Sequence, residues 1–378
     1  MLPGGVSVCA AGLDRPKVRV NVSAARGEER GHRGHRGLGS TLPARLPMLT
    51  VVIPVYNAEK WLPETLGSVL AQNYPRERYE IVVVDDGSED CSPAVARGLL
   101  DGARVSHQLI EIGKNTGPSH ARNVGWKRGT GSWIQFLDAD DLLHPEKMAV
   151  QAEAAVALPD EVAVAYSNWQ YLNRIEREWI PLEPVNSPLV DDDPLTELLE
   201  SEGFVHTGSA LFRKAWLERV GGFDERHTLI EDVDLMLRIA MAGGKFNRVG
   251  TDQPLFFYRR GLVGSLSQQD KRAFLEGCVR NAELVESYCC GNEVLTSARA
   301  QAIASVYFFA ARNFIELDRE RFEQLARQLE SLSPRFRPSE PAYLRWLSRL
   351  LGYRNAERLS WPLQKAYRKL RTALPRSR

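Results

Sequence analysis

Phe136-Leu137-Asp138-Ala139-Asp140-Asp141 places three carboxylates directly after an apolar run that begins at Trp133. The apolar run predicts a buried strand, so the carboxylates are expected at its C-terminal end. Like charges this close repel each other unless water or a cation lies between them. Ligands also bind outside the carboxyl ends of strands in open α/β sheets. The segment therefore indicates a divalent cation carrying a diphosphate, and the alternative is a solvated turn that caps the following helix.

Apolar strands alternate with helical segments from Leu49 to about Tyr258. The expected strands are residues 50–53, 80–84, 105–112, 133–137, 162–166 and 204–212, and the expected helices include 58–72, 118–127 and 231–241. Continuous β-branched runs between helices predict an α/β fold with a mainly parallel sheet covered on both faces. Residues 169–194 have mixed composition with several prolines, and we expect an irregular insertion there.

The two ends of the chain differ in composition from its middle. Residues 1–47 are rich in Gly, Arg, Pro and Ser, so we expect disorder, or an extension that precedes a true start at Met48. Residues 268–334 show helical periodicity. Residues 335–378 carry twelve Arg or Lys against two Glu, interleaved with Trp, Tyr and Leu. This basic tail is typical of an amphipathic helix on an anionic membrane surface. The alternative is a solvated helix packed on the α/β domain.

Bulk composition narrows the class of protein. The 378 residues are 43% hydrophobic and 26% charged, as in a globular protein, and the net charge of +1 gives no case for nucleic acid binding. No segment reaches the roughly 18 uninterrupted apolar residues of a membrane span. The five cysteines form no metal-binding pattern, so we expect reduced thiols in a cytoplasmic protein. The basic tail adds peripheral attachment to the inner face of the cell membrane.

Three further segments carry residues suited to a nucleotide. Ile53-Pro54-Val55-Tyr56-Asn57 ends the first strand, and its aromatic ring can stack on a base. Val84-Asp85-Asp86-Gly87-Ser88 ends the second strand, where a carboxylate can accept hydrogen bonds from a base or ribose. Residues 113–123 open a helix whose N-terminal dipole can face a phosphate. Each segment alone also fits an ordinary turn or helix cap, and the third lacks the spacing of a P-loop or dinucleotide fingerprint.

These segments, taken in order, resemble those of the GT-A glycosyltransferases of family 2. The matching text is Val-Ile-Pro-Val-Tyr-Asn, Val-Asp-Asp-Gly-Ser, Gly-Pro-Ser-His-Ala-Arg-Asn and Phe-Leu-Asp-Ala-Asp-Asp. It continues with Val-Gly-Gly-Phe-Asp-Glu at residues 220–225 and Ile-Glu-Asp-Val-Asp-Leu at residues 230–235. Six segments in the same order are far more specific than any one of them. The resemblance covers residues 48–267, which we expect to form a GT-A domain.

The resemblance implies a nucleoside-diphosphate sugar as donor and inversion at the anomeric carbon. By position, Pro54, Tyr56 and Asp86 are expected to hold the base and ribose. Asp138 and Asp140 match the family's Asp-x-Asp, with Asp140 as the direct ligand of a Mg²⁺ or Mn²⁺ ion. Hard oxygen ligands suit these cations, which neutralise the charge that develops on the leaving diphosphate.

The acceptor side is implied by the later motifs. Asp232 matches the family's catalytic base, which takes the proton of the acceptor hydroxyl, and Glu231 is expected beside it. The alternative for this pair is acidic residues in the first turn of a helix, which the helix dipole favours. Arg122 is expected to contact the nucleotide-sugar.

One motif departs from the family pattern. Many members read Tyr-Arg-x-His and then Ser-x-Ser, whereas this chain has Tyr258-Arg259-Arg260-Gly261, followed by Ser at 265 and 267. Glycine therefore replaces a histidine that would face the diphosphate or the metal. Arg259 or Arg260 is expected to supply the positive charge instead.

The expected function is the transfer of a sugar to an acceptor hydroxyl of a glycan or lipid-linked intermediate, in cell-surface polysaccharide or glycolipid synthesis. A non-catalytic nucleotide-sugar-binding or scaffold protein is the alternative, which the altered position 261 favours and the intact carboxylates oppose. Nucleotidyl transfer is disfavoured because no glycine-rich triphosphate loop follows the first strand.

Overall fold

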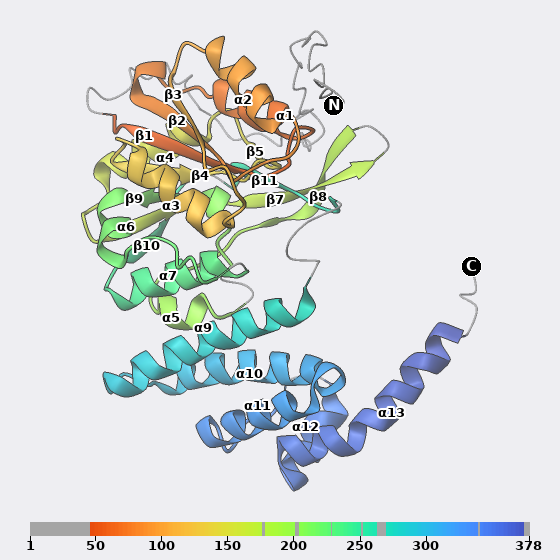
Figure 1. Cartoon of the computed structure of the whole chain (residues 1–378). Helices are drawn as coiled ribbons and strands as arrows, with labels where there is room; N and C mark the ends of the chain where they lie inside the picture. The colour runs from red at the N-terminus through yellow and green to blue at the C-terminus, as the bar shows by residue number, and fades with distance from the viewer. Residues whose placement is uncertain are drawn as a thin grey trace, which may run out of the picture. The chain divides into compact units, whose positions relative to one another are not determined.

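The computed structural model describes residues 46–175, 178–200, 204–227, 229–250, 252–262, 270–338 and 341–373, with side chains up to residue 365. The chain divides into two compact units (Figure 1). The first unit comprises Met1–Asp191 and Val205–Ser265, and the second comprises Asp192–Phe204 and Leu266–Arg378. The candidate site residues all belong to the first unit.

The first unit is built on a seven-stranded sheet with the order β10-β6-β9-β4-β1-β2-β3. Its strands are β1 (Leu49–Val55), β2 (Tyr79–Asp85), β3 (Ser106–Glu111), β4 (Trp133–Phe136), β6 (Val162–Tyr166), β9 (Ala210–Arg213) and β10 (Lys245–Arg248). β1, β2, β3 and β4 run parallel, and β9 is antiparallel to both β4 and β6. The predicted α/β class with a mainly parallel sheet is confirmed. The strand expected over residues 204–212 begins only at Ala210, because a 3₁₀ turn occupies Thr207–Ser209.

Helices cover this sheet because its central strands are apolar on both faces. The helices of the unit are α1 (Leu62–Leu70), α2 (Ser92–Asp101), α3 (Pro118–Arg128), α4 (Lys147–Ala157), α6 (Lys214–Val220) and α7 (Glu231–Met241). α3 packs on β1 and β2. Gly125 permits this close packing, since a Cβ atom there would lie 2.3 Å from Cγ1 of Val52. The N-terminus of α3 is thereby fixed near the ends of the parallel strands.

A second, four-stranded sheet completes the first unit, in the order β5-β11-β7-β8. Its strands are β5 (Leu142–Leu143), β7 (Trp169–Ile175), β8 (Glu178–Asn186) and β11 (Phe256–Arg259). The prediction of an irregular insertion over residues 169–194 is therefore wrong for β7 and β8, which pair antiparallel. Pro181 and Pro184 obscured the pattern. They lie in β8 at the edge of the sheet, where a missing N–H donor is tolerated.

The second unit consists of helices among its described residues. They are α5 (Pro194–Glu197), α9 (Lys271–Gly291), α10 (Ser297–Leu317), α11 (Arg319–Leu332), α12 (Ala342–Leu351) and α13 (Tyr353–Ala373). Side chains of Asp270, Thr296 and Asp318 cap α9, α10 and α11 by accepting backbone N–H groups. α10 packs against α9 and α11 around buried side chains such as Phe314 and Phe322. The predicted C-terminal helical region is confirmed.

Cysteine chemistry agrees with the prediction in part. Cys278, Cys289 and Cys290 are free thiols, and Cys9 lies outside the described residues. Within the described ranges, no helix is both long enough and apolar enough to span a membrane.

Candidate active site

Three of the predicted segments follow neighbouring parallel strands. β4, β1 and β2 are adjacent in the sheet, so residues 137–141, 56–57 and 86–88 emerge at one edge. The backbone N–H of Leu137 donates to Val52 O at 3.0 Å, and that of Asp86 donates to Val55 O at 2.8 Å. These bonds extend the strand pairing up to the polar segments. The topology therefore brings the proposed nucleotide and metal residues to a common edge.

Arg122 of α3 joins the two acidic motifs. Its Nη2 donates to Oδ1 of Asp138 at 2.7 Å, and its Nη1 donates to Oε1 of Glu231 at 2.7 Å. The residue is only 6% exposed, and its guanidinium also lies 5.3 Å from the ring centre of Phe223. One buried cation thus holds together an Asp-x-Asp segment and a Glu-Asp pair that lie far apart in the sequence.

Arg122 and its carboxylate partners stabilise one another in their charged forms. Burial lowers the pKa of Arg122, but the carboxylates of Asp138 and Glu231 more than offset that effect and raise it. Burial raises the pKa of Asp138, but Arg122 and then His206 bring it below its usual value. Arg122 therefore stays charged and Asp138 stays ionised near neutral pH.

Asp140 and Asp141 form no such ion pair among the described residues. Burial and the charge of Asp138 raise the pKa of Asp140 to about 6. Burial, then the charges of Asp140 and Asp138, raise the pKa of Asp141 well above its usual value. Oδ1 of Asp141 accepts from the Arg259 N–H at 2.9 Å, but Oδ2 is buried with no hydrogen-bond partner in the described part of the chain. The cluster thus contains more carboxyl groups than its surroundings can keep ionised.

The helix-cap alternative for this acidic cluster is wrong. The next helix, α4, begins at Lys147 with Glu146 at its N-cap, and no side chain caps it. Asp141 instead precedes β5 and binds the backbone of β11. The cluster is a strand-end feature.

The uncompensated cluster fits a divalent cation that also has ligands from outside the protein. No group of three or more acidic, His or Cys side chains among the described residues forms a complete metal site. Asp138 and Asp140 supply hard carboxylate oxygens. Mg²⁺ is commonly held by one or two carboxylates, with substrate phosphates and water as the remaining ligands. The residues present therefore fit a cation that arrives with a diphosphate.

Glu231 and Asp232 lie in the first turn of α7, as the helix-terminus alternative also predicted. Ile230 precedes the helix with φ of 62°, a left-handed conformation that is unusual for a β-branched residue. Burial and then the charge of Glu231 raise the pKa of Asp232 to about 7. A carboxyl group with this pKa can accept a proton near neutral pH.

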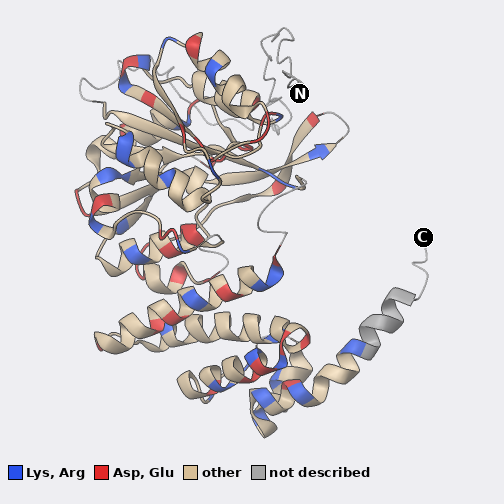
Figure 2. Cartoon of the chain, viewed as in Figure 1, with Lys and Arg blue, Asp and Glu red and all other residues tan. Residues whose placement is uncertain are grey.

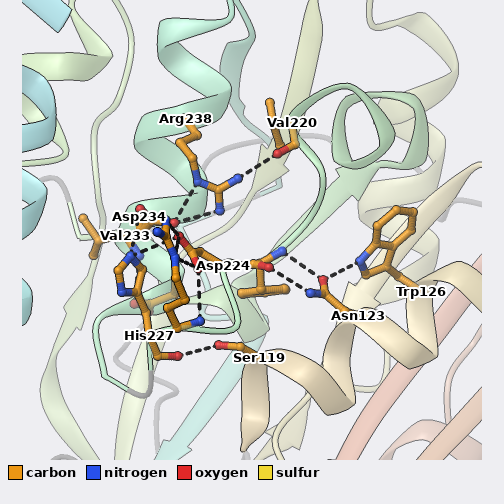
Figure 3. A network of polar contacts seen from close by, with 12 residues as sticks. Ser119, Asn123, Trp126, Val220, Asp224, His227, Val233, Asp234 and Arg238 are labelled. Atoms are coloured by element: carbon orange, nitrogen blue, oxygen red, sulfur yellow. Dashed lines mark hydrogen bonds and ion pairs between the residues drawn. The ribbon is translucent and has the colours of Figure 1, made fainter.

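A hydrogen-bond network ties the segment before α7 to α3 (Figure 3). Asn123 of α3 binds both the N–H and the carbonyl of Phe223, at 2.9 and 2.8 Å, and accepts from Nε1 of Trp126 at 2.9 Å. Oγ of Ser119 donates to the carbonyl of His227 at 2.8 Å. Because Arg122 lies on the same helix, these bonds fix the segment that leads to Glu231 and Asp232.

The same network includes the body of α7. Arg238 joins Asp234 at 2.7 Å and donates to the carbonyl of Val220 at 2.9 Å (Figure 3). Nε2 of His227 lies 3.4 Å from Asp224 and 3.8 Å from Asp234. Asp224 and Asp234 are thus structural residues, although they neighbour the predicted base in sequence.

Of the residues predicted to bind the nucleotide, Tyr56 and Pro54 are at least partly exposed to solvent, whereas Asp86 is buried. Tyr56 is 46% exposed and Pro54 is partly exposed, so both are accessible to a ligand. Asp86 is 3% exposed, and it accepts from the Thr116 N–H at 2.9 Å, the Thr116 hydroxyl at 2.6 Å and the Gly117 N–H at 2.7 Å. Asp86 therefore holds the glycine-rich turn that precedes α3.

Arg259 is 2% exposed and packs against the rings of both Trp61 and Trp179, 5.7 and 5.0 Å from their centres. Its Nη1 donates to the carbonyl of Asp140 at 3.1 Å, and its Nη2 pairs with Glu64. Burial lowers the pKa of Arg259, although the carboxylates of Glu64, Asp141 and Asp140 act in the opposite direction. These contacts fix the backbone of the Asp-x-Asp segment, and a direct contact of Arg259 with a diphosphate stays a prediction.

The remaining part of that motif is described only in part. Arg260 is exposed and lies 4.4 Å from the ring centre of Tyr171. Gly261 has φ of 76°, and a Cβ atom added there would meet no atom of the described residues within 4 Å. The serines at 265 and 267 lie outside the described residues.

Sequence reasoning missed the contacts of three residues that shape this region, although the loop from His206 to Ser209 was expected to influence specificity. Glu64 pairs with Arg259, His206 interacts electrostatically with Asp138, and Lys147 is fully buried in α4. Only Lys147 had a signal in the sequence. It lies on the helix face that also carries Met148 and buried alanines, where a solvated lysine is not expected.

Comparison with known proteins gives the class. Residues 50–221 match the family model described as glycosyl transferase family 2. The chain therefore carries a family 2 glycosyltransferase domain, as its motifs predicted.

Curated relatives agree with this assignment. The succinoglycan biosynthesis protein ExoO of Rhizobium meliloti is 29% identical over 231 residues, which are 60% of this chain and 65% of that protein. The amylovoran biosynthesis glycosyltransferase AmsB of Erwinia amylovora is 29% identical over 230 residues, 59% of this chain and 72% of that protein. This chain spans a smaller share of other relatives. An uncharacterized glycosyltransferase of Rickettsia bellii is 28% identical over 193 residues, and this chain spans only 27% of its length. This chain also covers 58% of the length of each of two further Rickettsia relatives.

Solved structures support the fold. The structure of S. aureus TarS 1–349 matches with a TM-score of 0.58 at 18% identity, over 84% of this chain and 92% of that one. The same protein in complex with UDP-GlcNAc matches with a TM-score of 0.61 at 19% identity, over the same shares of the two chains. With the family match, this likeness confirms the predicted GT-A fold.

Proposed function

We propose that this chain is an inverting glycosyltransferase that moves a sugar from a nucleoside-diphosphate sugar to an acceptor hydroxyl. The observation that carries the proposal is the double ion pair of Arg122. It brings Asp138, which suits the donor diphosphate and its cation, beside the Glu231-Asp232 pair, which suits the acceptor. A transfer reaction needs both groups within one site.

The donor would bind along the ends of β1, β2 and β4. The exposed ring of Tyr56 can stack on the base, with Pro54 beside it. Asp138 and Asp140 would hold Mg²⁺ or Mn²⁺. When bound, such a cation neutralises negative charge on the departing nucleoside diphosphate. The UDP-GlcNAc in one TarS structure supports a nucleotide-sugar as the class of donor.

The acceptor hydroxyl would lose its proton to Asp232. Burial and Glu231 hold the pKa of this carboxyl group near 7, which is close to the optimum for a base at neutral pH. Glu231 is bound to Arg122 and has little exposure, so it would position the first turn of α7 and tune Asp232.

The names of two relatives support the class of product. ExoO and AmsB are named for the biosynthesis of succinoglycan and amylovoran. We therefore infer that this chain acts in the synthesis of a cell-surface polysaccharide or glycolipid, on a glycan or lipid-linked acceptor.

Attachment to an anionic membrane surface belongs to the same proposal, and α12 offers a face for it. Leu344 and Ser348 are buried on one side, while Trp346 and Leu350 on the other are 60% and 65% exposed. Tyr343 extends this apolar stripe and is 44% exposed. Trp, Tyr and Leu beside basic residues are typical of helices that lie at a bilayer interface.

The charge on α12 favours lipid over a second copy of the chain. Arg345 and Arg349 are exposed beside the stripe, and α12 contains no acidic residue (Figure 2). A symmetric dimer through this face would oppose arginine to arginine, whereas anionic headgroups complement it. The alternative of a helix that is simply solvated leaves the exposed Trp346 and Leu350 unexplained.

The test of the proposed function is a donor screen that measures released nucleoside diphosphate in the presence of Mn²⁺ and an acceptor extract. Asp232→Asn should abolish transfer while it preserves donor binding. Asp140→Ala should abolish turnover that depends on the metal. Full transfer by Asp232→Asn contradicts the assigned base, and donor binding without any release in the wild type favours the non-catalytic alternative.

A further inference from the structure

One face of the four-stranded sheet is aromatic and partly open. Trp169 and Tyr171 of β7 are aligned with Phe256 and Tyr258 of β11, and alternation along each strand places these four rings on the same face. Trp169 and Phe256 are buried, whereas Tyr171 and Tyr258 are partly exposed. The ring centres of Tyr171 and Tyr258 are 5.6 Å apart. We refer to these four residues as the aromatic face.

The opposite face of the sheet packs in a buried hydrophobic cluster. Leu172 and Phe257 point to that side, where they form a buried cluster with Leu142. The tyrosines at 171 and 258 lie on the side of the sheet away from this core, and both are partly exposed.

His206 links the aromatic face to the carboxylates. Its ring centre lies 4.9 Å from that of Tyr258 and 4.6 Å from that of Phe256. Burial lowers its pKa to about 4, although the charge of Asp138 acts in the opposite direction. His206 is therefore neutral at physiological pH, and it lies within electrostatic reach of Asp138.

The turn that carries His206 is held by a buried polar network. Nε2 of Gln135 donates to the carbonyl of Gly208 at 3.0 Å, and Nε2 of Gln151 donates to that of Ser209 at 2.9 Å. Lys147, which has no exposed surface, donates to the side-chain oxygens of both glutamines. Buried polar networks of this kind rigidify what they bind when every group is satisfied.

Gly208 allows the turn to rest on the aromatic face. A Cβ atom at this position would lie 2.3 Å from the ring of Phe256, closer than any real contact. The turn and the rings therefore form one preorganised surface, as binding sites require.

The strand order separates this surface from the donor side. The proposed nucleotide segments follow β1 and β2 on one side of β4, whereas the His206 turn leads into β9 on the other side. β9 is antiparallel to β4, so the turn lies at the same sheet edge as Asp138. Asp138 thus lies between the donor segments and the aromatic face.

The outer end of the aromatic face is partly exposed and carries a positive charge. Leu182 of β8 lies opposite Tyr171 and is partly exposed, and Ile180 further along β8 is 39% exposed. Arg260 lies over the ring of Tyr171 at 4.4 Å and is itself exposed. A ligand that enters along this face would reach Asp138 past His206.

We propose that the aromatic face is the acceptor subsite, and that a pyranose ring of the acceptor glycan stacks on Tyr258 and Tyr171. The C–H groups on one side of a pyranose are weakly positive and suit the negative face of an aromatic ring. A few polar groups beside aromatic walls are also the usual composition of a small-molecule site. This assignment rests on the proposed function, and it names the substrate class of the acceptor.

The test is saturation-transfer NMR with three simple probes: methyl β-D-glucopyranoside, methyl β-D-galactopyranoside and methyl α-D-mannopyranoside. Wild-type protein should transfer saturation to the ring protons of at least one glycoside. Tyr258→Ala should weaken binding of that probe about tenfold, whereas Tyr258→Phe retains the ring and should preserve it. Tyr171→Ala provides a second variant if Tyr258→Ala fails to fold, and Tyr56→Ala on the donor side should leave the signal unchanged.

A second measurement distinguishes failure of the acceptor subsite from failure of the proposed function. Binding of UDP, GDP and dTDP with Mn²⁺ is measured on the same samples by calorimetry. Nucleotide binding without saturation transfer to any glycoside, or with equal transfer in wild type, Tyr171→Ala and Tyr258→Ala, overturns the acceptor subsite alone. Absence of nucleotide binding overturns the proposed function instead.

Discussion

Arg122 and Glu231 form a buried ion pair, with 2.7 Å between Nη1 and Oε1, that fastens the first turn of α7 to α3. The side chains are 7% and 12% exposed. The other amino group of the same guanidinium binds Asp138. The proposed donor and acceptor groups are thus coupled through one residue, whose removal should affect both stability and activity.

Arg122→Met should destabilise the protein by about 3–5 kcal/mol, because it leaves two buried or half-buried carboxylates without their cation. Urea unfolding at neutral pH measures the change. The matched control is Arg97→Met, which breaks an exposed ion pair with Glu111 at 2.6 Å and should cost about 1 kcal/mol or less. Equal losses in the two variants contradict a special role for Arg122.

Glu231→Gln should move the pH dependence of transfer. Asp232 acts as a base only when it is ionised, so kcat/KM should rise with pH as Asp232 loses its proton, near pH 7. Because the charge of Glu231 raises that pKa, its removal should shift the rise to lower pH. A bound cation lowers the same pKa, so profiles are compared at one saturating Mn²⁺ concentration.

The control for this shift is Glu225→Gln. Glu225 binds His120 at 2.8 Å and Asn123 at 2.8 Å, and it is not among the groups that shift the pKa of Asp232. Its profile should coincide with that of the wild type. A profile that moves equally in both variants, or in neither, contradicts the tuning of Asp232 by Glu231.

Gly222→Ala should destabilise the protein more than Gly221→Ala. Both glycines have positive φ, 74° and 81°, so alanine at either costs about 1–2 kcal/mol for the left-handed backbone. Only at Gly222 would the new Cβ also lie 2.5 Å from Oδ1 of Asn123. Thermal unfolding of the two variants compares them directly, and an equal loss shows that the contact with Asn123 is not tight.

Trp346→Glu with Leu350→Glu should abolish binding to vesicles of anionic phospholipid, because it places two charges in the exposed stripe of α12. Co-sedimentation measures the bound fraction. Leu189→Glu is the control, since Leu189 is 61% exposed but lies in the first unit. Membrane binding that survives the double substitution, or that is lost equally in the control, excludes this face.

Much of the fold could be predicted because its signals are local. The strands of residues 50–53, 80–84 and 133–137 are continuous apolar runs, and their polar ends carry the family motifs. The hairpin of β7 and β8 was missed because prolines at a sheet edge resemble an irregular loop. Strand pairing there depends on β11, which lies far along the chain.

The site could be predicted by residue type but not by contact. The sequence predicts Arg122 in the first turns of a helix and Arg259 at the end of a strand. Both positions are compatible with a contact to a ligand. The structure shows that Arg122 bridges two acidic motifs and that Arg259 packs against Trp61 and Trp179. Such roles depend on packing between distant segments, which no local pattern contains.

Calorimetric titration of wild-type protein and Asp140→Ala with UDP, GDP and dTDP, with and without Mn²⁺, tests the proposed donor site most directly. If Asp140 holds a cation that bridges the diphosphate, at least one nucleotide binds the wild type more tightly with Mn²⁺, and Asp140→Ala loses this dependence. Binding that is equal with and without Mn²⁺ in both proteins, or no binding of any of the three nucleotides, would contradict a metal-dependent nucleotide-sugar site.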